Sequence, residues 1–152
     1  MTAGYDVTLL TVEADPIAAV AATTNWDEFP SLWGKLLDEV WAVIRSGGVE
    51  KAGHNVMLYK DDTPTVEVGV QVAGPFAPVG RVVPSALPAG RVVATVHRGS
   101  YDGLGAAHDA VHRWAAANGH TLSRVRWEIY GDWSDDPAAV ETEVRWLVSE
   151  PG

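Results

Sequence analysis

Apolar positions along the chain recur with two different periods, one typical of strands and the other typical of helices. Alternating β-branched and apolar residues predict strands over 5–12, 17–24, 54–60, 65–73, 81–87, 91–98, 125–131 and 140–148. Helical spacing predicts one helix that begins at Ser31 and ends before Gly47, and a second over 101–118 that ends at Gly119. We therefore expect an α+β fold, with an antiparallel sheet and two main helices.

The order of the predicted elements repeats once along the chain. Residues 5–74 and 79–149 each run strand, strand, helix, strand, turn and strand, and the segment 74–78 joins them. Tyr59 matches Tyr130 in this register, and Met57 takes the position of Glu128. A tandem duplication within one domain predicts pseudo-two-fold symmetry and a ligand groove where the two units meet.

Charge and composition narrow the classes of function. The net charge is −9, with 11 Lys and Arg against 20 Asp and Glu, and the cations form no run. Phosphate binding needs clustered cations, so we expect no direct contact with nucleic acid. No apolar run is long enough to cross a membrane, no secretory leader is visible and there is no cysteine. These features favour a cytoplasmic protein.

Aromatic residues point to a particular type of ligand. Seven Trp in 152 residues is a high count for packing alone, because each buried indole N–H needs a partner. A surplus of Trp suits a surface that meets flat ligands.

Several short strings, in a fixed order, resemble one known family. The strings are LPAGRVVAT (87–95), HRGSYD (97–102), WEIY (127–130), DP (136–137), ETEV (141–144) and, in the first half, the stretch 55–61. In this order they resemble the GyrI-like small-molecule-binding domains, which also form the effector-binding part of multidrug-responsive MerR-type and AraC-type regulators. Family regulators also carry a helix-turn-helix module, for which this chain has no room, so the resemblance is to a stand-alone form.

The resemblance implies a binding site for hydrophobic, often cationic, aromatic molecules. The Glu of the Glu-Ile-Tyr string lies in the family's pocket floor, and Glu128 takes that role here. Family pockets are lined by aromatic residues after the second strand and in the final strands. The further candidates for this lining are Trp26, Trp33, Met57, Tyr59, Tyr101, Tyr130 and Trp146. No cofactor or metal is implied.

Strand alternation gives Glu128 a neighbourhood that fits this role. Arg126, Glu128 and Tyr130 share one face of the predicted strand, opposite an apolar face. A carboxylate on this face could line a pocket, pair with Arg126 or Arg145, or be solvated. The strand alone leaves these alternatives open.

Two other motifs have simpler interpretations. His108 and His112 stand four residues apart, as in zinc-binding His-Glu-x-x-His motifs. Asp109 replaces the Glu of that motif, and no third ligand is evident. We therefore interpret both residues as ordinary helix-face histidines. The glycine-rich segment 99–105 lacks the spacing of a nucleotide-binding loop and predicts a turn and helix entry.

Three classes of function follow. The preferred interpretation is non-catalytic sensing or sequestration of aromatic compounds, with a role in drug resistance. The alternative is a hydrolase that opens cyclopropane-containing DNA-alkylating natural products, as some GyrI-like proteins do, through Glu128 with Tyr59 or Tyr130 as proton donor. A raised carboxylate pKa would assist that chemistry. The third class is a module that acts by contact with a protein partner.

Overall fold

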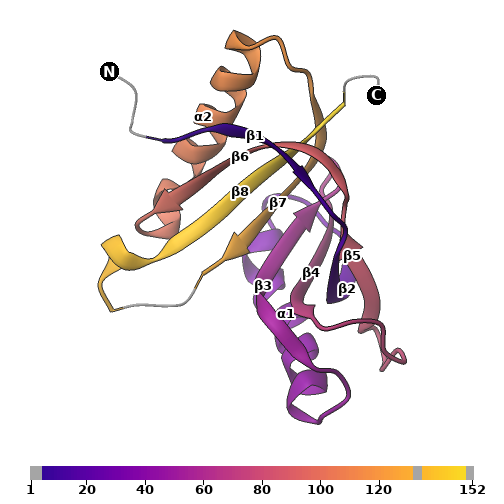
Figure 1. Ribbon diagram of the computed structural model, residues 1–152. Helices are drawn as coiled ribbons and strands as arrows, with labels where there is room; N and C mark the ends of the chain where they lie inside the picture. The colour runs from indigo at the N-terminus through magenta and orange to yellow at the C-terminus, as the bar shows by residue number, and fades with distance from the viewer. Residues whose placement is uncertain (1–4, 132–134, 150–152) are drawn as a thin grey trace.

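Two β-β-α-β-β units follow each other along the chain (Figure 1). The computed structural model describes residues 5–131 and 135–149. The first unit contains β1 (Thr8–Val12), β2 (Asp15–Thr23), α1 (Phe29–Arg45), β3 (Lys51–Tyr59) and β4 (Thr65–Val72). The second contains β5 (Val83–Leu87), β6 (Gly90–Arg98), the short 3-10 helix η1 (Tyr101–Gly103), α2 (Leu104–Ala117), β7 (Leu122–Tyr130), the short 3-10 helix η2 (Pro137–Ala139) and β8 (Glu141–Val148).

All eight strands form one antiparallel sheet in the order β1-β6-β8-β7-β3-β4-β2-β5. The units meet at three strand pairs, β1 with β6, β2 with β5 and β3 with β7. In the central pair, β3 with β7, Met57 lies directly opposite Glu128. Asn55 faces Tyr130 and Tyr59 faces Arg126 on either side of that pair. The two residues matched by the sequence repeat therefore lie on the pseudo-two-fold axis itself.

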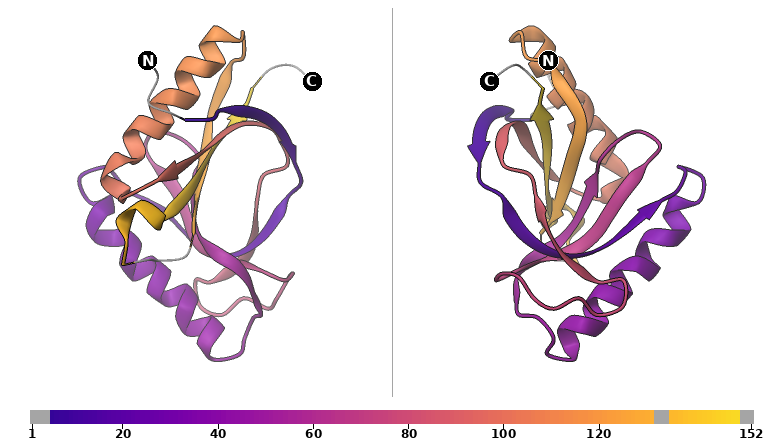
Figure 2. Two further views of the ribbon diagram at one scale, coloured as in Figure 1. Left: turned by 60° about the vertical axis from the view of Figure 1, so that its left-hand side comes forward. Right: turned by 90° about the vertical axis from the view of Figure 1, so that its right-hand side faces the viewer.

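Three clusters of buried side chains hold the sheet and helices together. Strand alternation sends Val66, Val68 and Val70 to the face covered by α1. The middle cluster lies on the other face of the sheet, around Trp127 and Leu58, and takes residues from both units. The third lies between α2 and the strands β6 and β8. Figure 2 shows the curved sheet with the two helices on its outer side.

The predicted order of elements is confirmed, and several boundaries differ from those expected. β2 begins at Asp15 and includes Pro16, because at this point the strand pairs only with the edge strand β5, where a missing N–H is tolerated. Helix α1 begins at Phe29, before Ser31, because Pro30 fits the first turn of a helix.

Two strands begin earlier than the alternation predicts, for a shared reason. β3 starts at Lys51 and β7 at Leu122, and each shows a register shift before regular pairing begins at Asn55 and at Arg126. A bulge breaks the period of two on which the sequence prediction rests. The bulges fall at matching places in the two units.

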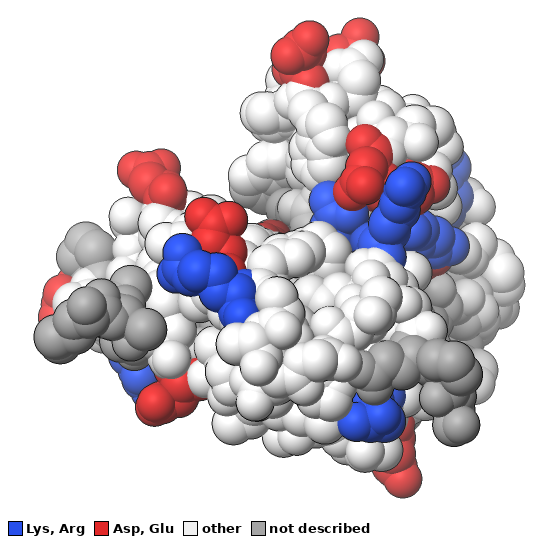
Figure 3. Space-filling view, turned by 90° about the horizontal axis from the view of Figure 1, so that it is seen from above, with Lys and Arg blue, Asp and Glu red and all other residues white. Residues whose placement is uncertain are grey.

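Charged side chains on the outer surface lie mostly in mixed groups. Arg81 pairs with Glu39, and Arg98 with Glu141 at 2.7 Å. On the face drawn in Figure 3, blue and red side chains are interspersed, with no broad basic surface. No helix in the part of the chain that the structure describes is long and apolar enough to cross a membrane.

Candidate functional site

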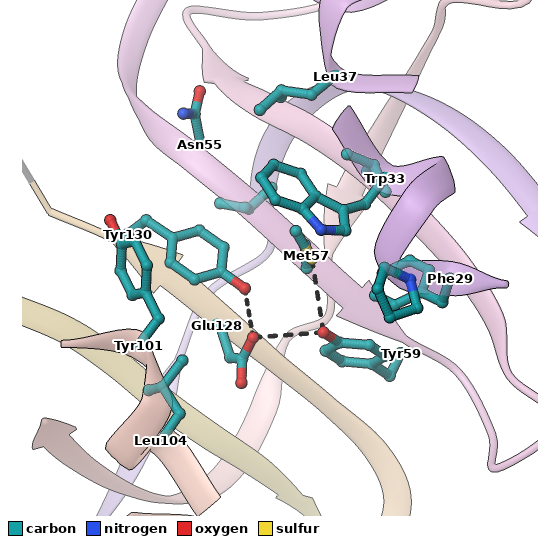
Figure 4. Close-up of a pocket in the computed structure, with 13 residues that line it drawn as sticks. Phe29, Trp33, Leu37, Asn55, Met57, Tyr59, Tyr101, Leu104, Glu128 and Tyr130 are labelled. Carbon is teal, nitrogen blue, oxygen red and sulfur yellow. Dashed lines mark hydrogen bonds between the residues drawn. The ribbon is translucent and has the colours of Figure 1, made fainter. Parts of the chain in front are cut away.

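A cavity of about 360 Å³ opens between α1 and the start of α2, above the central strands β3 and β7 (Figure 4). Its position follows from the fold, because both helices cover the same face of the sheet and leave the strands at the axis uncovered. The residues that line it are Phe29, Pro30, Trp33, Leu37, Asn55, Val56, Met57, Tyr59, Val68, Tyr101, Leu104, Glu128 and Tyr130.

Glu128 lies in this cavity and is only 6% exposed. Its Oε1 accepts a short hydrogen bond from the Tyr130 hydroxyl and a longer one, 3.4 Å, from the Tyr59 hydroxyl (Figure 4). Its Oε2 lies 2.7 Å from Nε2 of His108, which comes from α2. Three side chains from three elements thus converge on one carboxylate.

The pKa values at this site keep the carboxylate ionised and the tyrosines protonated. Burial by itself raises the pKa of Glu128. The hydrogen bonds from His108, Tyr130 and Tyr59, together with attraction to the charge that His108 carries when it is protonated, outweigh burial and lower that pKa below 4.5. Burial and the adjacent carboxylate raise the pKa of Tyr59 and of Tyr130 well above 10. The raised carboxylate pKa that would assist hydrolysis is therefore not found.

Arg126 shares the strand face of Glu128 but is bonded to other groups. Its Nη1 lies 2.8 Å from Oδ1 of Asp62, and its guanidinium stands 5.1 Å from the ring centres of Tyr59 and Trp146 and 5.7 Å from that of Trp26. Arg145, the other cation considered as a partner, pairs with Glu143. Neither arginine forms an ion pair with Glu128.

Most of the predicted site residues come together, and two lie elsewhere. The cavity unites Glu128 with Trp33, Met57, Tyr59, Tyr101 and Tyr130. Trp26 is outside the lining, 47% exposed and packed on Phe29 and Tyr59. Trp146 is also outside it, behind His108, to which its indole donates a hydrogen bond.

His108 is the residue that sequence reasoning missed. The prediction of an ordinary helix-face histidine is wrong, because both of its ring nitrogens are engaged, one with Glu128 and one with Trp146. The helical spacing indicated which residues share its face but could not indicate which strand that face meets. The apolar lining residues Phe29, Leu37 and Leu104 are also absent from the predicted site residues.

The zinc-like spacing on α2 forms no metal site in the described ranges. Over residues 5–131 and 135–149 no three potential ligands gather in one place. His112 packs its ring against Trp146, with 4.3 Å between the ring centres, and so belongs to the aromatic cluster behind the cavity.

Comparison with known proteins agrees with this architecture. The family described as GyrI-like small molecule binding domain matches residues 5–148. The chain belongs to this family. A comparison with curated proteins finds no match.

Solved structures share the GyrI-like fold across nearly the whole chain. The C-terminal domain of EcmrR has a TM-score of 0.82 at 21% identity, covering 97% of this chain and 99% of that one. SAV2435 bound to tetraphenylphosphonium has a TM-score of 0.71 at 10% identity, covering 95% and 94%. A hydrolase from Listeria innocua has a TM-score of 0.68 at 13% identity, covering 95% and 92%. These identities are low, so the likeness shows a common fold.

Proposed function

We propose that this GyrI-like domain binds hydrophobic, cationic aromatic molecules in the cavity, to sense or sequester them, with Glu128 as the anchor. The observation that carries the proposal is a buried carboxylate in an aromatic cavity, with no Lys or Arg of the described chain bonded to it. Its role in drug resistance is part of the same proposal.

The charge of the cavity favours a cation. A desolvated carboxylate costs several kcal/mol unless it is compensated. Tyr59 and Tyr130 stabilise Glu128 as neutral donors and leave its negative charge in place. A bound cation supplies the missing countercharge, which a neutral molecule of the same shape cannot do.

The walls of the cavity favour flat or bulky apolar groups. Phe29 and Leu37 form apolar surface on the side of α1, and Trp33 and Tyr101 stand at 39% and 43% exposure. A cation against such rings gains roughly 0.5–2 kcal/mol per contact. Apolar contact contributes ~25 cal/mol per Å² without strict shape requirements. Broad specificity with modest affinity follows, and the tetraphenylphosphonium found in SAV2435 is a ligand of this type.

Calorimetric titration with tetraphenylphosphonium tests the proposal. We expect binding of this cation and none of tetraphenylborate, an anion of the same shape. Glu128→Gln keeps the volume and removes the charge, so we expect affinity to fall at least about ten-fold, which corresponds to ~1.4 kcal/mol.

A matched control comes from the other side of the sheet. Glu67 is also 6% exposed but pairs with Lys60 and Ser85 and does not line the cavity. We expect Glu67→Gln to change stability and to leave the affinity for the cation unchanged. Equal binding of tetraphenylphosphonium by wild type and Glu128→Gln would refute the anchor role.

Hydrolysis of cyclopropane-containing alkylators is the second candidate. Its support is the convergence of the hydroxyls of Tyr59 and Tyr130 on Glu128, and a neighbour described as a hydrolase. The raised pKa of both tyrosines makes them weak acids, and the lowered pKa of Glu128 makes it a weak base, so binding ranks first. Mass spectrometry for a ring-opened water adduct separates the two.

A further inference from the structure

His108 lies between the carboxylate of Glu128, which accepts hydrogen bonds, and the indole N–H of Trp146, which donates one. It comes from α2, and its side chain is 20% exposed. Nε2 lies 2.7 Å from Oε2 of Glu128, and Nδ1 lies 2.9 Å from the indole Nε1 of Trp146. The rings of His108 and Trp146 meet edge to face, with 5.9 Å between their centres.

The indole determines which nitrogen of His108 carries the proton. A tryptophan N–H can only donate, so Nδ1 of His108 must accept and holds no proton. The single ring proton then lies on Nε2, from which it is donated to Glu128. A second proton would sit on Nδ1 and point at the indole N–H. This geometry favours the neutral imidazole, whose contact with Glu128 is a hydrogen bond between a neutral donor and a carboxylate.

This assignment decides the charge of the cavity. An imidazolium in the same place would cancel the carboxylate charge at a distance of 2.7 Å. Tyr59 and Tyr130 are neutral donors, and the nearby Arg126 is paired with Asp62. With a neutral His108, every group bonded to Glu128 fixes its position and none removes its charge.

The arrangement is specific to the second unit. The register that matches Met57 with Glu128 also matches Leu37 of α1 with His108 of α2. At these matched positions the first unit contributes the apolar pair Leu37 and Met57 to the cavity lining. The second unit contributes Glu128 to the lining, and His108 bonds that carboxylate from α2.

We propose that Trp146 holds His108 in its neutral Nε2–H form, and that His108 thereby acts as a positioning residue that sets the preference of the cavity for cations over neutral molecules. The proposal rests on the proposed function, because it concerns the same cavity. It adds a residue outside the lining, Trp146, that controls the charge seen by the ligand.

The protonation state of His108 can be measured without any ligand. In protein labelled with ¹⁵N-histidine, long-range proton–nitrogen NMR correlations distinguish the neutral forms from the imidazolium. We expect a protonated Nε2 and an unprotonated Nδ1 for His108 at neutral pH. An imidazolium, or the form protonated on Nδ1, overturns the proposal.

Two substitutions of His108 test its effect on ligand preference. The readout is the ratio of the affinities for tetraphenylphosphonium and for the neutral triphenylphosphine oxide. His108→Gln restores a neutral N–H near the position of Nε2, and we expect it to keep the wild-type ratio within about three-fold. His108→Lys places a cation beside Glu128, and we expect the ratio to fall at least about ten-fold.

A matched control is available on the same helix. His112→Lys adds the same charge one turn further along α2, where the ring packs against Trp146, whereas His108 bonds Glu128 itself. We expect it to change the ratio much less than His108→Lys does, because the charge is farther from Glu128.

The outcomes separate this proposal from the function on which it rests. If wild type binds the cation and His108→Lys keeps the wild-type ratio, the role of His108 is wrong and the proposed function stands. If wild type does not bind tetraphenylphosphonium at all, the proposed function fails, and the NMR measurement still decides the form of His108. If His108→Lys does not fold, the NMR measurement on wild type still decides the protonation form of His108.

Discussion

The polar contacts of the cavity centre on one carboxylate, that of Glu128. Removing an ionised group from water costs several kcal/mol, and hydrogen bonds to charged groups return about 1.5–3 kcal/mol each. Tyr59, Tyr130 and His108 provide three such bonds. The site is therefore stable without ligand, and its donors are held in place before a cation arrives.

The ionisation of Glu128 predicts how binding depends on pH. Its folded-state pKa lies below 4.5, so the stability it contributes is fully present above that value and is lost as the pH falls through the folded-state pKa. For the permanently charged tetraphenylphosphonium we expect the affinity to decline in acid as Glu128 takes up a proton, with a midpoint below 4.5. Calorimetry at a series of pH values checks it. A midpoint above pH 5, or the same profile in Glu128→Gln, contradicts the assignment.

Arg126 shows that the chain itself uses aromatic rings to hold a cation. Three rings, those of Trp26, Tyr59 and Trp146, surround a guanidinium that is anchored by Asp62. This accounts for two of the predicted site tryptophans, Trp26 and Trp146, lying outside the cavity.

At the scale of elements, close contact between strands is as important as alternation. β4 carries valines on the side of α1, but Gly69 interrupts the opposite side. A Cβ at Gly69 would stand 2.2 Å from the backbone oxygen of Ala18 on the neighbouring strand β2. Only glycine lets β2 and β4 approach this closely.

Alanine substitution at two glycines tests this contact. Gly69→Ala forces the backbones of β2 and β4 apart, and we expect a loss of at least ~2 kcal/mol in the free energy of unfolding, as overpacking typically costs 1–3 kcal/mol and backbone atoms cannot rotate away. Gly34→Ala in α1 is the matched control, since a Cβ there meets nothing within 4 Å. We expect a gain of about 0.5–1 kcal/mol from helix propensity. Urea denaturation measures the free energy of unfolding of both variants. If Gly69→Ala were as stable as Gly34→Ala, the close contact between β2 and β4 would have no role.

At the scale of the whole molecule, the two units share one core and one cavity. The middle cluster takes Ile17 and Leu58 from the first unit, and Val92 and Trp127 from the second. Because β3 also pairs with β7, neither unit can close its own sheet without the other. The cavity lies on the axis between them, so it exists only when both are folded.

Trp127 provides a test of this shared core. It is fully buried between the units, and we expect Trp127→Ala to cost about 3–5 kcal/mol. Circular dichroism and Trp fluorescence should report one coincident unfolding transition in wild type and variant, because the core belongs to both units. Trp26→Ala, at a position 47% exposed, should cost less than half as much. Two separate transitions would indicate independent units.

Much of the fold could be predicted from the sequence because it depends on local patterns. Period-two and helical spacings predicted the strands and helices in order, and the repeat matched Met57 with Glu128, two positions that the structure then places opposite each other. Alternation also placed Glu128 and Tyr130 on one face of β7, where the structure has them. The boundaries missed at β3 and β7 lie at register shifts, where that local period is broken.

Contacts between distant elements were decided by the tertiary structure alone. Local spacing indicates which residues share a face, but the partner of that face depends on how helices pack on the sheet. For this reason Arg126 pairs with Asp62 and His108 reaches Glu128, although neither contact is visible in the sequence. The sequence by itself thus determined which side chains share a face of a strand or helix. Packing decided which of them reach the carboxylate of Glu128, and the charge of the cavity depends on that.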